Sequence, residues 1–207
     1  FDIQMQTNHL SHFLLLSLIF PLIETAQDKR NDARIITHSS LARQGSALQA
    51  KYFQQGGNLG GDGSSMMCGG ARWERYHQTK LANCVFTHAL NKRLKKINCN
   101  IKSVCAAPGL STTNLQQNTF NNGGMSDGCC GNIFIMKYAQ SAADGSLGIL
   151  KASFGNDVQS GEFYEPQGLT GIGGLPTLIT NSKSEINEKQ GDLLWKCSEE
   201  AIKATWL

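Results

Sequence analysis

Four stretches of the chain repeat apolar residues at helical spacing, and each predicts an α-helix. These stretches cover residues 3–26, 74–96, 141–154 and 183–207. The first is the richest in apolar residues, so we expect it to be buried on more than one side. Its apolar run from Leu10 to Ile23 contains polar residues and Pro21, and we expect it to be too short to span a bilayer.

Short hydrophobic runs lie between these stretches and predict strands at residues 34–40, 101–106 and 160–164. Strands that alternate with helices indicate βαβ units and a parallel sheet. The 207 residues suit one domain of the α/β class.

Three polar or glycine-rich segments separate the predicted elements. Residues 43–72 hold eight of the 22 glycines and predict a long loop, with a short helix near 46–54. Residues 111–132 are rich in Asn, Thr and Gly, and residues 168–181 form a Gly/Pro-interrupted loop. Loops as long as residues 43–72 are usually functional or disordered.

Charge and cysteine usage exclude some function classes. A net charge of +3 is too balanced to indicate nucleic-acid binding. The seven cysteines show no metal-ligand spacing, so no metal site is predicted. We interpret them as reduced thiols in a reducing intracellular compartment, either the cytoplasm or an organelle matrix or stroma.

Tyr76 and Lys80 are the residues that point most directly to chemistry. A spacing of four residues near the start of a helix places both on one face, one turn apart. A phenol titrates near pH ~10, and an ammonium about 5–6 Å away lowers its pKa. We therefore expect Tyr76 to exchange a proton with a substrate oxygen. The alternative is a chance surface pair.

Two other polar residues occupy informative positions. Ser40 ends a predicted strand, at the edge where a parallel sheet binds ligands, so its hydroxyl either donates to a substrate carbonyl or caps the next element. Asn8 is an amide within an apolar helix, where a buried polar group needs a partner. The Asn8 amide would stabilise an irregularity in the helix, bind a water, or simply be a hydrogen-bonded asparagine in the core. We interpret His38 as a strand residue rather than a catalyst.

Four motifs, taken in order, resemble the short-chain dehydrogenase/reductase family. Asn-His-Leu-x-His-Phe begins at Asn8, Arg-Ile-Ile-x-x-Ser-Ser at Arg34, Tyr-x-x-x-Lys-Leu-Ala-Asn at Tyr76 and Pro-Gly-x-x-x-Thr at Pro108. The third motif resembles the retinol dehydrogenase and protochlorophyllide reductase branches. The resemblance covers residues 1–115. It implies a Rossmann-like, doubly wound parallel sheet in three α/β/α layers, of which this chain is the C-terminal part.

The resemblance also assigns roles to individual residues. It implies that Asn8 supports a relay water, that Ser40 polarises the substrate carbonyl, that Tyr76 is the acid/base, and that Lys80 lowers the pKa of Tyr76 and binds the nicotinamide ribose. The matching contacts to the nicotinamide would come from Pro108, Gly109 and Thr113, and residues 111–132 would form a loop that contacts substrate or cofactor. The implied reaction is hydride transfer between NADP or NAD and a small, lipophilic carbonyl or alcohol. The branch resemblance favours NADP.

The family's glycine-rich, pyrophosphate-binding turn is absent from these 207 residues. We therefore expect a partial domain that lacks its nucleotide-binding half. The alternative is a non-catalytic subunit with this fold in a larger assembly. Family comparison also implies a homodimer formed through the first helix and the Tyr76 helix.

Overall fold

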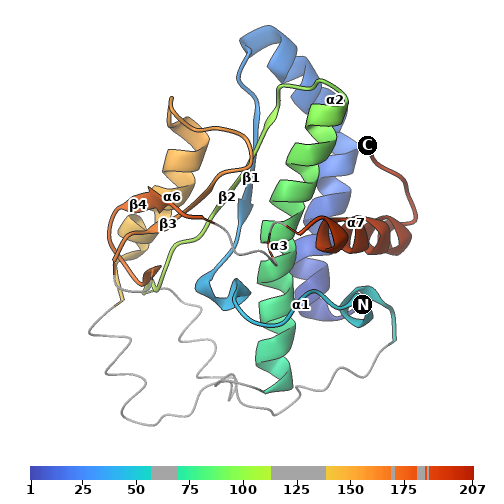
Figure 1. Cartoon of the computed structure of the whole chain (residues 1–207), viewed down its shortest axis with the longest axis horizontal. Coiled ribbons are helices and arrows are strands. Elements are labelled where there is room, and N and C mark those ends of the chain that lie inside the picture. Colours follow the sequence, from blue (N-terminus) through green and yellow to red (C-terminus); the bar gives the residue numbers. More distant parts are fainter. Residues whose placement is uncertain (57–69, 113–138, 169–170, 181–184, 186) are drawn as a thin grey trace.

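The computed structural model describes residues 1–56, 70–112, 139–168, 171–180, 185 and 187–207. These residues form a sheet that lies between helices (Figure 1). The α/β, Rossmann-like arrangement expected from the sequence is confirmed, because the sheet is mostly parallel and flanked by helices.

The sheet has the strand order β1-β2-β3-β4. Its strands are β1 (Arg34–His38), β2 (Lys102–Ala106), β3 (Phe163–Pro166) and β4 (Pro176–Leu178). The first three are parallel, and Ile36 pairs with Val104 in the register of β1 and β2. The carboxyl ends of β1 and β2 therefore meet at one edge, where Ser40 and Pro108 follow them.

Strand β4 runs antiparallel to β3 and was not expected. The sequence prediction placed it inside a Gly/Pro-rich loop, because Pro176 and the glycines before it are typical of turns. A proline is tolerated at the first position of a strand, and Pro176 occupies that position. The prediction of a loop throughout 168–181 is therefore wrong.

The first helical segment runs past its predicted end at residue 26. It consists of α1 (Ile3–Met5), a π-helical turn (Gln6–Leu10) and α2 (Ser11–Arg30). It ends at Asn31, which adopts the left-handed conformation with φ 54°. The buried side chain of Gln27, interpreted from the sequence as part of a polar turn, accepts a hydrogen bond from the Ala33 backbone N–H at 2.8 Å.

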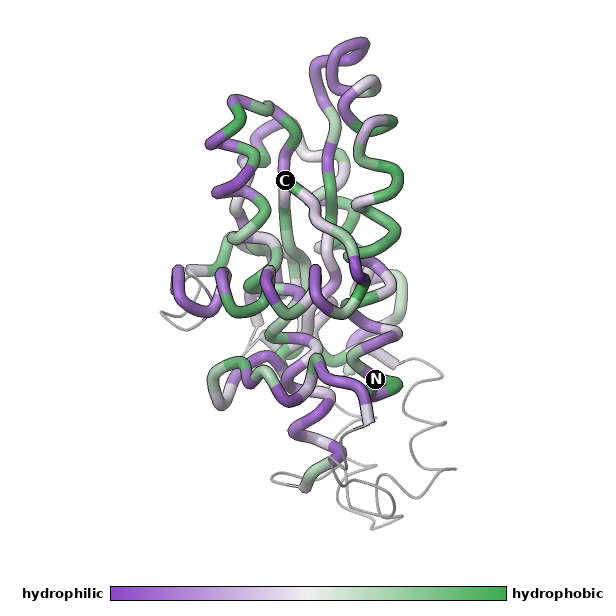
Figure 2. Tube along the Cα trace, turned by 90° about the vertical axis from the view of Figure 1, so that its right-hand side faces the viewer, coloured by the Kyte–Doolittle hydropathy of each residue, from purple (hydrophilic) through white to green (hydrophobic). Residues whose placement is uncertain are grey.

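Burial on several sides of α2 is also not found. Phe13 and Phe20 are buried, but the side chains of Leu18 and Leu22 are about 70% exposed. Figure 2 shows α2 as a mostly hydrophobic trace that descends from the polar turn at the top. By length and composition, the helix over residues 3–30 is long and apolar enough to cross a membrane. The sequence expectation of a segment too short to span a bilayer concerns only the shorter run from Leu10 to Ile23. The core helix of a soluble protein meets the same criterion as residues 3–30.

The largest core cluster lies where α2, α3 (Ala71–Lys96) and α7 (Glu188–Ile202) meet. Aromatic rings fill it: the ring centroids of Phe13 and Trp195 are 5.1 Å apart, and those of Trp195 and Trp206 are 5.2 Å apart. Trp195 also donates its indole N–H to the Trp206 carbonyl at 3.0 Å. This packing fixes α3, the helix that carries the tyrosine–lysine pair, against its neighbours.

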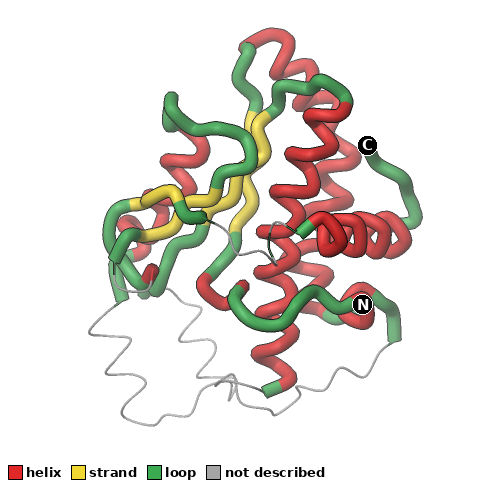
Figure 3. Tube along the Cα trace, viewed as in Figure 1, coloured by secondary structure: helices red, strands yellow, loops and turns green. Residues whose placement is uncertain are grey.

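Helix α6 (Ala142–Phe154) packs against β1, β2 and β3 on the side away from α3 (Figures 1 and 3). Ser141 caps its first turn by accepting from the Asp144 backbone N–H at 3.0 Å. The predicted helices at 74–96 and 141–154 are thus confirmed. The predicted helix at 183–207 begins later, at Glu188, with Asn187 as its cap.

The long loop after β1 contains two short 3₁₀ helices, Leu41–Arg43 and Ala50–Phe53. The second coincides with the short helix predicted near residues 46–54. Residues 57–69 of this loop and residues 113–138 of the second loop lie outside the described part of the chain.

Candidate active site

Tyr76, Lys80 and Ser40 come together at the carboxyl end of β1. Tyr76 and Lys80 lie on one face of α3, with the Lys80 ammonium 5.7 Å from the centroid of the Tyr76 ring. The side chains of Ser40 and Tyr76 share a hydrogen bond. Ser40 also caps the following 3₁₀ helix, because its hydroxyl oxygen accepts from the Ala42 backbone N–H at 3.2 Å. Both interpretations of Ser40 therefore apply.

Asn8 sits in the π-helical turn, so the expected helix irregularity is present. Its amide donates to the Thr79 hydroxyl at 3.0 Å, and that hydroxyl donates to the Tyr76 carbonyl at 2.8 Å. The backbone oxygen of Asn8 lies 3.1 Å from Nδ1 of His12. Asn8 thus connects the first helix to the turn of α3 that holds Tyr76. Single-turn π-bulges occur frequently at functional sites.

The Lys80 side chain is buried and extends toward the end of β1. Its Nζ lies 3.3 Å from Nδ1 of His38 and 3.5 Å from the His38 carbonyl oxygen. Burial disfavours the charged ammonium and lowers the pKa of Lys80 to about 8. His38 is therefore a neighbour of a predicted catalytic residue, which the sequence interpretation missed. Its position directly before the two serines is the signal that could have suggested this.

The expected lowering of the tyrosine pKa is not found. Burial of the phenol raises the pKa of Tyr76, and the hydrogen bond with Ser40 offsets this only in part. The charge on Lys80 does not reverse the effect, because its Nζ is directed at His38. Tyr76 is therefore protonated at neutral pH and is suited to donate a proton to a substrate oxygen.

Asn83 and His9 hold the end of β1 in place. The Asn83 amide donates to the His38 carbonyl at 2.9 Å, and the Asn83 side chain also hydrogen-bonds His9. Nε2 of His9 lies 2.9 Å from the hydroxyl oxygen of Ser198 on α7. This continuous set of contacts joins β1, α3 and α7 behind Lys80.

Pro108 and Gly109 form the turn that follows β2. Gly109 has φ +68°, and a Cβ at this position would lie 2.5 Å from the Ile172 carbonyl oxygen. Only glycine fits this combination of conformation and close approach. The Ile172 carbonyl also accepts from the Leu110 backbone N–H at 2.7 Å. Thr113, the third predicted contact to the nicotinamide, lies outside the described residues.

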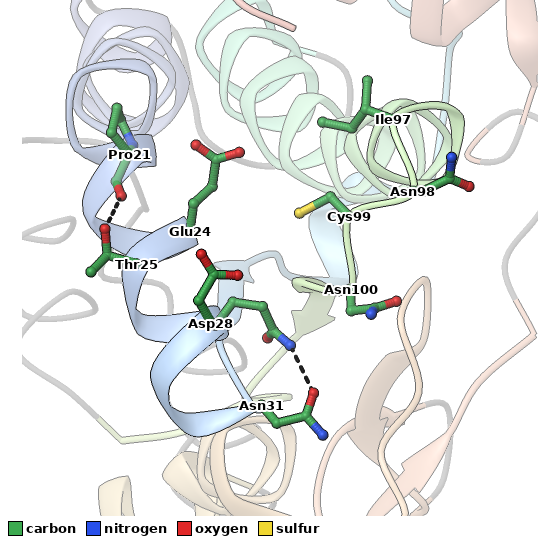
Figure 4. A pocket seen from close by; sticks show the side chains of 10 residues that line it. Pro21, Glu24, Thr25, Asp28, Asn31, Ile97, Asn98, Cys99 and Asn100 are labelled. Atoms are coloured by element: carbon green, nitrogen blue, oxygen red, sulfur yellow. Dashed lines mark hydrogen bonds between the residues drawn. The ribbon is translucent and has the colours of Figure 1, made fainter.

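A cavity of about 610 Å³ opens beside this site. Its polar lining residues are Asn8, His9, His12, Arg34, Thr37, His38, Lys80 and Asn83, and the other lining residues are apolar. A second cavity, of about 680 Å³, lies between the carboxyl ends of α2 and α3 and contains none of the predicted site residues (Figure 4). Among the described residues, no group of three or more His, Cys, Asp and Glu side chains is placed to hold a metal ion.

Known proteins resemble part of this chain. It is 35% identical over 117 residues to an uncharacterized oxidoreductase of Schizosaccharomyces pombe, which covers 56% of the chain and 32% of that protein. It is 31% identical over 113 residues to the chloroplastic short-chain dehydrogenase TIC 32 A of Brassica napus, covering 54% and 33%. A short-chain dehydrogenase/reductase of Colletotrichum higginsianum is 30% identical over 122 residues. The chain is similar to short-chain dehydrogenases.

The matched part of the chain spans about a third of the length of these relatives. Their names support a general oxidoreductase function. No protein-family model matches the chain. A crystal structure of an uncharacterized protein from Mycobacterium paratuberculosis superposes with a TM-score of 0.68 at 24% identity, over all of this chain and 61% of the other. That likeness supports the fold.

Proposed function

We propose that this chain carries the proton-transfer centre of a nicotinamide-dependent oxidoreductase that interconverts a carbonyl and an alcohol. The observation that carries the proposal is the gathering of Tyr76, Ser40 and Lys80 at the carboxyl end of β1, with Ser40 interacting with the Tyr76 side chain and Lys80 one helical turn away. Two adjacent hydroxyls can both approach one substrate oxygen. Ser40 holds that oxygen, and Tyr76 gives it a proton during reduction or takes the proton during oxidation.

The residues present fit the nicotinamide end of a dinucleotide. Tyr76 and Lys80 would hold the ribose, and the turn at Pro108 and Gly109, which follows β2, would contact the nicotinamide. When bound, the cofactor supplies or accepts the hydride. We assign no described residue to the pyrophosphate, because no glycine-rich turn of the required kind occurs in the sequence. The resemblance to the retinol dehydrogenase and protochlorophyllide reductase branches favours NADP over NAD.

A small lipophilic carbonyl or alcohol is the substrate class that we propose. The cavity beside Lys80 supports this class, because apolar residues such as Leu16, Ile19 and Ile23 line it together with polar groups. Such a cavity matches a molecule with one polar reacting group on an apolar body. We further propose that the protein works in a reducing intracellular compartment.

The direct test replaces Tyr76 by Phe in the full-length protein. The change removes the phenolic proton and keeps the ring, so reduction of a carbonyl by NADPH should slow by roughly 10²–10⁴-fold. Tyr52→Phe is the matched control, since Tyr52 is also buried but lies outside the site, and it should keep its rate. Unchanged turnover in Tyr76→Phe would exclude the mechanism.

A second candidate function is a non-catalytic subunit of a larger assembly. It is favoured by the exposed leucines of α2, Leu15, Leu18 and Leu22, and by the position of β1 at an edge of the described sheet. Unpaired strand edges and exposed apolar patches are typical binding surfaces. Separately, the family resemblance leads us to propose a homodimer formed through α2 and α3. Sedimentation of the purified protein with NADPH distinguishes the two, since a free monomer or dimer that binds NADPH excludes the non-catalytic role.

A further inference from the structure

His38 makes two contacts to the ammonium of Lys80. Nδ1 of the ring lies 3.3 Å from Nζ, and the backbone oxygen of the same residue lies 3.5 Å from it. The His38 carbonyl is held in place by the Asn83 amide at 2.9 Å. The ring lies at the last position of β1 and lines the same cavity as Lys80. One residue therefore supplies both acceptors found near this ammonium.

Only a neutral imidazole can accept a hydrogen bond from Lys80. An imidazolium would carry a proton on Nδ1 and would repel the ammonium. The surrounding protein and the charge of Lys80 both lower the pKa of His38, which keeps the ring neutral. The other ionisable groups that face Lys80 are Tyr76 on its own helix and Cys105 on β2, and His12 lines the cavity from α2.

We propose that His38 is a positioning residue for Lys80, whose neutral ring holds the ammonium at the wall of the cavity. In this position the Lys80 Nζ lies 5.7 Å from the centroid of the Tyr76 ring. Protonation of the ring in acid removes the acceptor and releases the ammonium. The role of Lys80 beside Tyr76 rests on the proposed function. The contact between His38 and Lys80 does not, because it requires no substrate.

Competitive acetylation of the full-length protein with acetic anhydride tests the contact. The rate at Lys80, followed by mass spectrometry across pH, reports the pKa of its amine. In His38→Leu the acceptor is lost and leucine offers none in its place, so the pKa of Lys80 should fall from about 8 by about one unit. His38→Asn supplies an acceptor oxygen near the position of Nδ1 and should keep the wild-type pKa. Exposed Lys29 serves as the internal reference.

Two results would overturn the proposal. One is an unchanged or raised pKa of Lys80 in His38→Leu, and the other is a fall in His38→Asn as large as that in His38→Leu. Far-ultraviolet circular dichroism of both variants checks that the fold is retained. Because acetylation requires no turnover, the result is independent of the Tyr76→Phe assay. Failure of that assay with the acetylation result intact would remove the oxidoreductase function but leave the His38–Lys80 contact.

Discussion

Burial of His9 makes the stability of this fold depend on pH. The ring is 1% exposed and lies among Phe13, Phe53 and Phe86, with ring centroids 5.8–6.0 Å away. Removal from water lowers its pKa from 6.5 to about 4, although a hydrogen bond with Asn83 opposes the shift. In the unfolded chain the same ring titrates near ~6.5. Between these two values the unfolded state therefore binds the additional proton.

The sign and size of the effect follow from this difference. Because protons bind preferentially to the unfolded state, the contribution of His9 to stability is complete above pH 6.5 and is lost as the pH falls toward 4. A difference of about 2.5 pKa units, at about 1.4 kcal/mol each, corresponds to roughly 3 kcal/mol.

Urea unfolding of the wild type and of His9→Gln, measured across this pH range, tests the prediction. Glutamine can still reach Ser198 but does not titrate, so the variant should lose about 3 kcal/mol less between pH 6.5 and 4. The lowered pKa of His88 adds to the slope in both proteins and cancels in the comparison. Parallel pH profiles for the two proteins would refute this account of His9.

Three other substitutions probe separate parts of the structure. Gly109→Ala places a Cβ 2.5 Å from a backbone oxygen at φ +68°. We therefore expect the free energy of unfolding to fall by at least about 2 kcal/mol and NADPH binding to weaken in calorimetry. In the control Gly56→Ala, at φ +71° with open space around the residue, the free energy of unfolding should fall by only about 1 kcal/mol. Arg43→Met removes the guanidinium that pairs with the buried carboxylates of Glu165 and Glu185 and should cost about 3–5 kcal/mol in urea unfolding. A loss below about 1 kcal/mol would contradict the ion pairs. Leu18→Gln should change the free energy of unfolding by no more than about 0.5 kcal/mol and should reduce self-association in size-exclusion chromatography. A cooperative loss of structure in this variant would contradict the exposure of Leu18 on α2.

The sequence predicts the scaffold of the site better than its electrostatics. The Tyr76–Lys80 spacing, the strand before Ser40 and the turn after β2 are local patterns, and the structure has all three. The pKa of Tyr76 depends instead on how deeply the phenol is buried and on where the Lys80 side chain points. Neither is a property of residue spacing, and the prediction of a lowered pKa was wrong for that reason.

Burial of α2 shows the same limit. The density of leucines predicts that the helix is covered, but periodicity does not specify what covers it. In the described structure Phe13 and Phe20 face α3 and α7, while Leu18 and Leu22 face outward. Strand β4 was missed because proline and glycine are typical of turns, whereas its hydrogen bonds to β3 arise only in the folded chain. His38 lacked any local signal apart from its position before the serines.

Transfer of deuterium tests the central claim most directly. The full-length protein, given NADPH that carries deuterium at the transferring position and a lipophilic aldehyde, should yield an alcohol with one deuterium on the former carbonyl carbon, as detected by mass spectrometry. The Tyr76→Phe variant should give the same product far more slowly, whereas Tyr52→Phe should match the wild type. Absence of deuterated alcohol from a folded wild-type protein that binds NADPH, across a panel of aldehydes and ketones, would contradict the account.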